Sequence, residues 1–281
     1  MPTQVRQLDP GLDAIAVLEA GDVVWQPRSF FAIQDRERPL FSPDVLASGK
    51  NVSFDPASGR VGGSSLAGDL SDVLRQMLAR FSDESHAFLT CACPRYTSRL
   101  VRGRASFRPI EIAGRPSSWR KDDTRLHVDA FPATPVHGRR ILRVFANVNP
   151  HGKPRSWRVG DSFGAVADHF APALRVPPPG ASALLTLLRI TKTMRSPYDA
   201  LMLQLHDHMK EDTGYQQQAP QTVFDFPAGS AWVVFTDAVS HAAMAGQYQL
   251  EQTFLLPVDA MLDERQSPLR ILERLKGRAL A

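Results

Sequence analysis

The sequence predicts a mainly β protein with flanking helices, an antiparallel sandwich or barrel that carries its helices on one side. Two observations predict this class. Six short segments, rich in β-branched and aromatic residues and closed by Gly, Pro, Asn or Asp, have the pattern of strands: Leu100–Phe107, Leu126–Phe131, Ile141–Val148, Thr222–Phe226, Ala231–Phe235 and Gln249–Leu256. Only a few isolated segments, by contrast, place apolar residues at helical spacing.

The helical segments are predicted in three places. The first covers residues 70–81, and the Ser-Asp pair at 82–83 is expected to end it. The second begins at the Ser-Pro pair 196–197, because serine is a preferred N-cap and proline suits the first turn, and it ends before Gly214. The third is a basic amphipathic helix within residues 267–280.

Composition restricts the class of protein. The chain has 281 residues, of which 43% are hydrophobic and 22% charged, the balance of a globular protein with a sizeable core rather than of a disordered or fibrous chain. No apolar run approaches the roughly 20 residues that a membrane-spanning helix needs. The N-terminus has no basic start followed by an apolar core, so we expect no secretory signal. Cys91 and Cys93 are expected to be reduced thiols, and a cytoplasmic location fits them.

The elements predict a single domain over residues 1–281. Residues 1–98 are expected to form a cover of helices and strands, and residues 99–257 the β core, with a helical insert at 181–215. Residues 258–281 are expected to form the C-terminal helix.

Positive charge is concentrated in one stretch. Over the whole chain 33 Lys and Arg oppose 29 Asp and Glu, a net charge of +4, and the pI is near 9.3. Residues 95–125 contain nine basic and three acidic side chains, so this stretch alone carries about +6. It is either a solvated basic face or the contact surface for a polyanion, such as nucleic acid, an acidic sugar or an anionic membrane.

One combination of residues predicts chemistry. His127 and Asp129 are two positions apart in a predicted strand, so they share a face. A distant histidine, His241, precedes the last predicted strand. Two imidazoles and one carboxylate form the facial triad of non-haem Fe(II) oxygenases, which leaves positions open for a bidentate co-substrate and dioxygen. The order of elements is that of the double-stranded β-helix (jelly roll, cupin-like) oxygenases, although His-x-Asp alone is a weak signal.

Longer blocks carry a more specific resemblance. The sequence resembles the 3-deoxy-D-manno-oct-2-ulosonic acid (Kdo) hydroxylases of Gram-negative bacteria in DAFP at 129–132, ILRVFANVNPHG at 141–152, LMLQLHDHMK at 201–210 and HAAMAGQYQLEQTF at 241–254. The resemblance runs from about residue 99 to residue 257 and is expected to cover the whole chain.

The resemblance implies an Fe(II)/2-oxoglutarate-dependent dioxygenase that also uses O₂. It implies hydroxylation of C3 of a Kdo sugar attached to lipid A, which gives D-glycero-D-talo-oct-2-ulosonic acid, succinate and carbon dioxide. It further implies His127, Asp129 and His241 as iron ligands. The expected partners are Kdo–lipid A and, transiently, an anionic membrane at the cytoplasmic face of the inner membrane, with no nucleic acid.

The residue that anchors 2-oxoglutarate is predicted separately. Many related oxygenases place an arginine about ten residues after the distal histidine, but Glu251 stands here, and a carboxylate repels the co-substrate. Arg143 lies sixteen residues after His127 and shares a strand face with Asn147, so both are predicted to face 2-oxoglutarate. Gln252 and Thr253 are further candidates for its hydrogen bonds. The alternative is that Arg143 pairs with Glu251.

The arginine-rich stretch fits an anionic substrate. Kdo carries a carboxylate and lipid A carries phosphates, and four candidate contacts follow: Arg99, Arg102, Arg104 and Arg125. Two other functions remain open at this point. One is a 2-oxoglutarate oxygenase that acts on another anionic substrate, and the other is a non-catalytic β-barrel that binds an anionic sugar or lipid.

Overall fold

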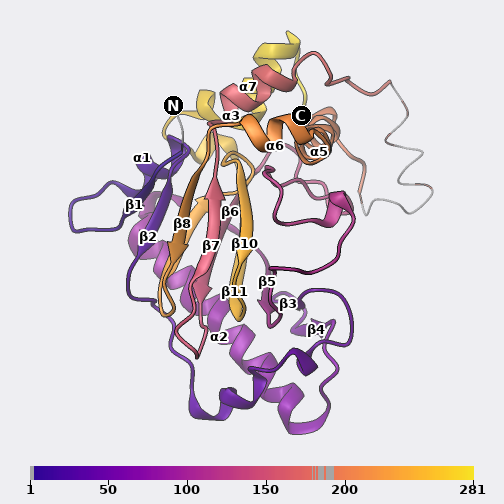
Figure 1. Ribbon diagram of the computed structural model, residues 1–281. Coiled ribbons are helices and arrows are strands. Elements are labelled where there is room, and N and C mark those ends of the chain that lie inside the picture. The colour runs from indigo at the N-terminus through magenta and orange to yellow at the C-terminus, as the bar shows by residue number, and fades with distance from the viewer. Residues whose placement is uncertain (1–2, 179, 181, 183–186, 188–192) are drawn as a thin grey trace.

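The computed structural model describes residues 3–178, 180, 182, 187 and 193–281, whose strands form two sheets (Figure 1). The larger sheet has the order β1 (Val5–Gln7), β2 (Val23–Gln26), β9 (Ala231–Phe235), β6 (Arg140–Asn147), β11 (Gln249–Leu256), β5 (Val101–Arg108), β3 (Val52–Asp55) and β4 (Arg60–Gly62). The smaller sheet has the order β10 (His241–Ala245), β7 (Arg155–Val159) and β8 (Thr222–Phe226). Apart from β1 and β2, neighbouring strands are antiparallel.

Aromatic residues fill the space between the two sheets. Trp157 of β7 lies 5.1 Å from Phe145 of β6 and 5.6 Å from Trp232 of β9, measured between ring centroids. Phe226 of β8 stacks on Trp232 at 4.0 Å. Such pairs bury large apolar areas, so they fix the distance between the sheets. Two packed, mainly antiparallel sheets with external helices confirm the predicted double-stranded β-helix fold.

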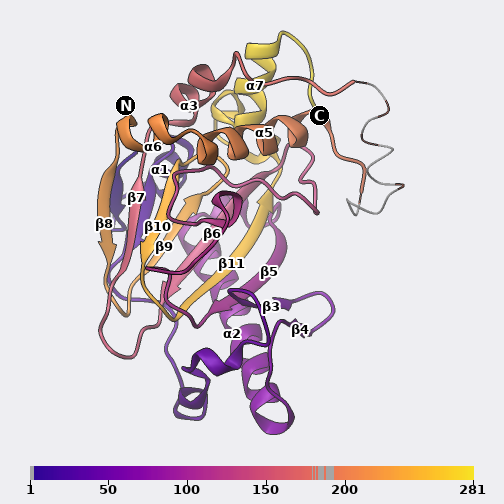
Figure 2. The same cartoon turned by 45° about the vertical axis from the view of Figure 1, so that its right-hand side comes forward.

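Helices cover the outer face and one end of the sandwich (Figures 1 and 2). α2 (Gly68–Ala92) crosses the back of the larger sheet, and α1 (Ala14–Glu19) lies against β2 and β9. Among the described residues, four more gather at one end: α3 (Phe163–Phe170), α5 (Pro197–Glu211), α6 (Thr213–Gln218) and α7 (Pro268–Lys276). Among the described residues, no helix is long and apolar enough to cross a membrane.

The sequence predictions for individual elements have mixed outcomes. β8, β9, β11 and the capped helix α5 form where predicted, with Ser196 as N-cap. The helix predicted over 70–81 is wrong in its ends, because α2 continues to Ala92. Ser82 and Ser85 are 1% and 0% exposed on its packed face. The Ser-Asp pair therefore continues the helix instead of ending it.

The N-terminal segment is more than a cover. β1 and β2 extend one edge of the larger sheet, while β3 and β4 extend the other. The predicted insert at 181–215 contains α5, but most of residues 181–192 lie outside the described residues. The division of the chain into residues 1–98, 99–257 and 258–281 stays a prediction.

The two faces of the larger sheet differ in polarity. On β11 and β5, the residues toward α2 are mainly apolar, among them Phe107, Leu250 and Phe254. The opposite face carries Arg108 and Glu251, whose side chains pair at 3.0 Å. This polar face borders the same cavity as His127 and His241.

Candidate active site

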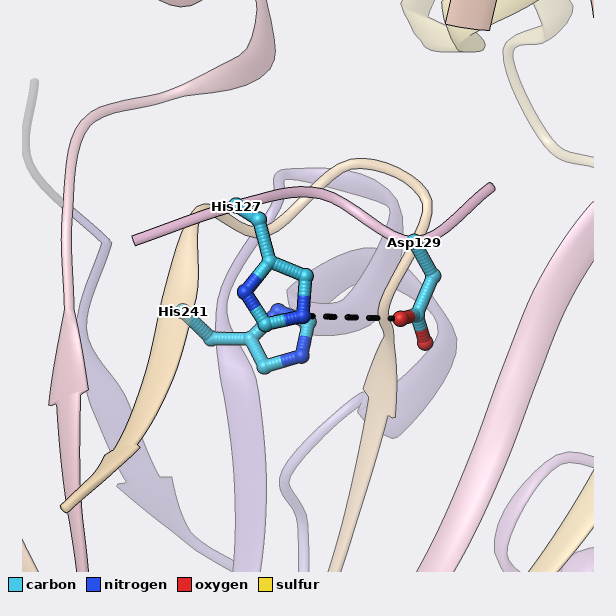
Figure 3. A group of neighbouring side chains, drawn as sticks. All are labelled: His127, Asp129 and His241. Carbon is cyan, nitrogen blue, oxygen red and sulfur yellow. Dashed lines mark ion pairs between the residues drawn. The ribbon is translucent and has the colours of Figure 1, made fainter. Parts of the chain in front are cut away.

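The triad is assembled by one isolated backbone bridge. The predicted strand Leu126–Phe131 is wrong, since Asp129 makes only a single backbone hydrogen bond, to the Thr236 carbonyl at 2.7 Å, and the one β-bridge joins His127 to His241 of β10. Each of these two residues donates its N–H to the other's carbonyl, at 3.0 and 2.9 Å. The pairing holds the imidazole centroids 4.6 Å apart. Asp129 follows on the same side, and one potential ligand atom from each residue lies within 4.8 Å of the others (Figure 3).

Backbone carbonyls orient both rings. Nδ1 of His127 lies 2.8 Å from the Arg125 carbonyl, and Nδ1 of His241 lies 2.8 Å from the Val239 carbonyl. A carbonyl only accepts, so each Nδ1 carries the proton and each Nε2 keeps a free lone pair. The stacked indole of Trp157, 5.0 Å from His241, restrains that ring further.

The protonation states suit a divalent metal. Burial lowers the pKa of both His127 and His241, so the imidazoles are neutral near pH 7. Burial opposes ionisation of Asp129, but the Arg143 guanidinium holds the pKa of its carboxyl well below the usual range. Two neutral nitrogens and one anionic oxygen fit Fe(II) and leave other positions open.

The triad opens into a cavity of about 410 Å³, which we call the iron-site cavity. Four guanidinium groups line it together with the triad, and three of them come from strands: Arg108 of β5, Arg143 of β6 and Arg155 of β7. Arg143 lies 3.3 Å from Asp129 and 3.7 Å from Glu251, and Arg108 lies 3.0 Å from Glu251.

Arg155 differs from the other two guanidinium groups. It is 2% exposed, donates to the Gly246 carbonyl at 2.8 Å, and has no carboxylate within 4.0 Å among the described residues. Its Nε and the Nε of Arg143 are buried without a hydrogen-bond acceptor in that part of the chain. A buried cation without an anion is costly. The cavity therefore has the chemistry to hold an anion.

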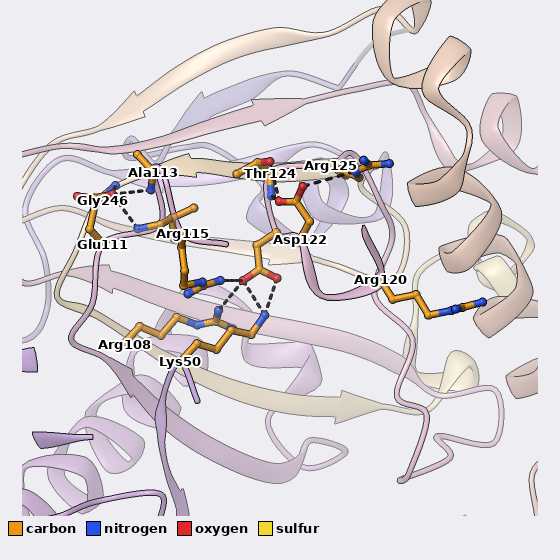
Figure 4. A network of polar contacts seen from close by, with 12 residues as sticks. Lys50, Arg108, Glu111, Ala113, Arg115, Arg120, Asp122, Thr124, Arg125 and Gly246 are labelled. Carbon is orange, nitrogen blue, oxygen red and sulfur yellow. Dashed lines mark hydrogen bonds and ion pairs between the residues drawn. The ribbon is translucent and has the colours of Figure 1, made fainter. Parts of the chain in front are cut away.

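Further cations lie around the cavity: Lys50, Arg120, Lys121 and Lys210. Asp123 is the main acidic partner among them, paired with Lys50 at 2.6 Å and with Arg108 at 3.4 Å. Figure 4 shows the side chains of Lys50 and Arg108 lying next to each other. Burial lowers the pKa of both Lys50 and Lys210. An anionic group that enters here finds more positive than negative side chains.

The structure brings only part of the predicted co-substrate set to this cavity. Arg143 lines it, and its alternative partner Glu251 is also beside it. Asn147 does not line it, because its amide donates to the carbonyls of Lys153 and Phe226, both at 3.0 Å. Gln252 lies on the opposite face of β11 and donates to the Gly103 and Thr253 carbonyls. These two amides have structural partners, and neither is placed to contact the co-substrate.

Thr253 and the four predicted substrate arginines also lie outside the iron-site cavity. Thr253 and Arg104 line an adjoining cavity. Arg99 pairs with Asp259 at 2.8 Å, and Arg102 pairs with Asp83 on α2. Arg125 donates to the Lys210 carbonyl at 2.7 Å, so its backbone carbonyl and side chain support two residues of the site without lining it.

Sequence reasoning missed several cavity residues. Arg155 and Trp157 are two positions apart on β7, and this spacing indicates that they share a strand face. His206 of α5 lies with its ring edge toward His127, 5.3 Å between centroids, which only the packing of α5 over the site reveals.

A chelating co-substrate and dioxygen require free positions on the metal, and this donor set provides them. Fold and site thus define a non-haem iron oxygenase of the double-stranded β-helix class. The family model of Kdo hydroxylase matches residues 3–279. The chain belongs to the Kdo hydroxylase family.

Solved structures agree with this assignment. A crystal structure of the Kdo hydroxylase KdoO, a non-heme Fe(II) alpha-ketoglutarate-dependent dioxygenase in complex with alpha-ketoglutarate and Fe(III), is 44% identical, with a TM-score of 0.96 over 99% of this chain and 98% of that chain. The apo structure of KdoO is 46% identical, with a TM-score of 0.95 over 99% and 97% of the two chains. A comparison with curated protein sequences finds no match.

Proposed function

We propose that this chain hydroxylates C3 of the Kdo sugar in Kdo–lipid A, with Fe(II), 2-oxoglutarate and O₂, and releases D-glycero-D-talo-oct-2-ulosonic acid, succinate and carbon dioxide. One observation carries the proposal: a buried His-Asp-His triad opens into a cavity that three guanidinium groups from the strands line. Membership of the Kdo hydroxylase family supports the substrate. The KdoO structures with alpha-ketoglutarate and with succinate support the co-substrate.

The triad would hold the metal through His127 Nε2, His241 Nε2 and the Asp129 carboxylate. Bound iron supplies the oxidising chemistry that couples decarboxylation of 2-oxoglutarate to hydroxylation of a C–H bond. The protein keeps both Nε2 atoms free by fixing the Nδ1 protons on backbone carbonyls. Arg143 keeps Asp129 ionised, so no proton has to leave the carboxyl before metal binds.

The guanidinium groups would hold the far carboxylate of 2-oxoglutarate. Arg155 is the main anchor, since it is the buried member that lacks an acidic partner among the described residues. It precedes Trp157 by two positions on β7, and Trp157 packs on His241. The strand thus carries the anchor and the ring that supports a metal ligand. Arg108 and Arg143 add positive charge, and Arg143 also pairs with the triad residue Asp129 at 3.3 Å.

The cations around the cavity would meet the substrate. Lys50, Arg120, Lys121 and Lys210 replace the four arginines predicted from the sequence as the basic groups nearest the iron site. The Kdo carboxylate and the lipid A phosphates are suitable partners for them. His206, which lines the same cavity with its ring 5.3 Å from that of His127, would contact the sugar as it reaches the triad.

The same proposal places the enzyme at the cytoplasmic face of the inner membrane, where the acyl chains of the substrate stay in the bilayer. The pI near 9.3 and the exposed Arg274 and Arg278 at the C-terminus support contact with anionic lipid. Flotation with vesicles tests this part alone. Binding should occur with anionic phosphatidylglycerol vesicles and weaken with salt, while equal binding to neutral vesicles would contradict it.

The test of the activity is product formation. Iron-loaded protein with 2-oxoglutarate and O₂ should release succinate faster when Kdo–lipid A is present, and mass spectrometry should show one added oxygen on the sugar. H127A should lose more than about a hundredfold of this rate, because it removes a metal ligand. R102Q is the matched control, since Arg102 pairs with Asp83 away from the cavity. Succinate without any sugar product would keep the oxygenase and reject the substrate, and no succinate at all would favour a binding protein.

A further inference from the structure

A second cavity, of about 470 Å³, adjoins the iron-site cavity and has no role in the function proposed above. We call it the outer cavity. The two cavities share five lining residues: Arg108, Phe131, Pro132, Arg143 and Glu251. A ligand in the outer cavity therefore lies next to the group that reacts at the iron site.

One wall of the outer cavity is a set of hydroxyl groups. Ser53, Ser106 and Thr253 come from β3, β5 and β11, which are neighbours in the sheet, and Ser53 stands opposite Ser106 in the register. In the part of the chain that the structure describes, none of these three side chains makes a hydrogen bond. Ser106 and Thr253 are nevertheless only 6% and 9% exposed. Hydrogen-bonding groups that face a cavity and lack partners are available to a ligand.

The facing wall is apolar. Phe131, Pro132 and Val136 belong to the segment that follows Asp129, whereas Leu255 lies beside Thr253 on the same face of β11. Hydroxyls on one side and apolar carbon on the other match a pyranose ring, which carries hydroxyl groups at its edge and C–H groups on its faces. The cavity is also within the usual size range of small-molecule sites, about 300–1,000 Å³.

A β-bulge directs one cation to this cavity. Gln252 pairs with Ala105 and Phe254 with Arg102, so two residues of β5, Gly103 and Arg104, stand opposite Thr253 alone. The amide of Gln252 donates to the Gly103 carbonyl at 2.9 Å and fixes the bulge. Bulges near active sites commonly redirect a side chain.

Glycine fits closely at the bulge. A Cβ at Gly103 would lie 3.1 Å from the Thr253 carbonyl oxygen, tighter than ordinary contact. The residue after it, Arg104, lines the outer cavity and is exposed. It makes no ion pair within the described residues, whereas its neighbour Arg102 pairs with Asp83.

We propose that the outer cavity is a second sugar subsite, which binds an anionic pyranose linked to the Kdo unit that is hydroxylated. The hydroxyl wall contacts the ring and Arg104 contacts its carboxylate or phosphate. The inference rests on the proposed function, because the neighbouring sugar is defined relative to the Kdo at the iron site. It assigns Arg104 a part in substrate selection and none in the reaction itself.

The test compares three acceptors. The first is the methyl glycoside of Kdo, the second is Kdo linked to a phosphorylated hexosamine, and the third is Kdo linked to a second Kdo. One of the two-sugar acceptors should have a KM about tenfold lower than the methyl glycoside in the wild type, the value of one charge-assisted hydrogen bond. Which of them does so identifies the anionic group as a phosphate or a carboxylate.

R104Q should raise the KM for that two-sugar acceptor to the value of the methyl glycoside and leave kcat unchanged. T134W, which fills the outer cavity from an exposed position, should do the same. R102Q is the matched control and should behave as the wild type does.

An R104Q variant with unchanged KM for both two-sugar acceptors would overturn the subsite. So would an equal rise in KM for the methyl glycoside, which would show that the outer cavity binds the reacting sugar. If the wild type hydroxylates none of the acceptors nor Kdo–lipid A, the proposed function fails and this inference fails with it.

Discussion

Arg140 and Arg155 are buried to the same extent, 1% and 2% exposed, but their surroundings differ. Arg140 of β6 donates to Asp237 at 2.8 Å and lies 3.9 Å above the Phe235 ring. Arg155 of β7 has a backbone carbonyl as its partner and no carboxylate within 4.0 Å in the described chain. One guanidinium is neutralised within the protein, while the other lacks an anion. A buried cation that the fold leaves unneutralised is a better indicator of an anion site than burial or charge alone.

The comparison is tested first on the paired arginine. R140M should lower the free energy of unfolding by about 3–5 kcal/mol, because it leaves the Asp237 carboxylate buried without its cation. Denaturant unfolding monitored by circular dichroism measures this. At a temperature where the variant is folded, its KM for 2-oxoglutarate should match the wild type. A stability unchanged within 1 kcal/mol would show that the Arg140–Asp237 pair is not structural.

The second prediction concerns the unpaired arginine. Addition of 2-oxoglutarate with Fe(II), kept anaerobic, at a hundred times its Kd should stabilise the wild type by about 2.7 kcal/mol, since the ligand binds only the folded state. R155M should lose about half of this stabilisation, or more, at the same ligand concentration. Its KM for 2-oxoglutarate should rise about tenfold or more, the loss expected when a charge-assisted hydrogen bond is removed.

Without ligand, R155M should be as stable as the wild type to within about 1 kcal/mol, because no buried carboxylate is left behind. Thermal shift with and without 2-oxoglutarate measures both effects. If R155M is destabilised as strongly as R140M and still binds 2-oxoglutarate normally, the two arginines have the same role and the assignment of the anchor is wrong.

The sequence predicted the chemistry of the triad better than its local structure. His127 and Asp129 were predicted to share a strand face, and they do lie on one side, but a single bridge to His241 replaces the strand. The His-x-Asp spacing was informative even without a strand, because a single β-bridge between His127 and His241 is enough to bring the ligands together. Arg143 was also predicted to lie near the co-substrate or to pair with Glu251, since a charged residue in the middle of an apolar strand requires a partner.

The inward position of Arg155 could not be predicted from the sequence, for a physical reason. The alternation of Arg155 and Trp157 indicates a shared face, but an isolated strand does not show whether that face is inside or outside. The packing of Trp157 against Phe145 and Trp232 decides it. Contacts between sheets that are distant in sequence therefore set the anion site, and a single strand pattern does not contain them.

The third prediction uses pH to sharpen the contrast. Burial raises the pKa of Asp237 above its ordinary value, and Arg140 counteracts this rise. In R140M the pKa of Asp237 in the folded state should rise still further above its pKa in the unfolded chain. Between these two values the folded state binds more protons than the unfolded state, so stability falls as pH rises and returns as pH falls.

The deficit of R140M relative to the wild type should therefore be largest near pH 7 and shrink by up to about 1.4 kcal/mol per pH unit as Asp237 becomes protonated. R155M exposes no such carboxylate, so its difference from the wild type should stay constant over the same range. Urea unfolding of the three proteins from pH 7 to pH 4.5 measures the slopes. A deficit of R140M that does not change with pH would show that Asp237 is not the group left uncompensated, and parallel slopes for both variants would remove the distinction between the two buried arginines.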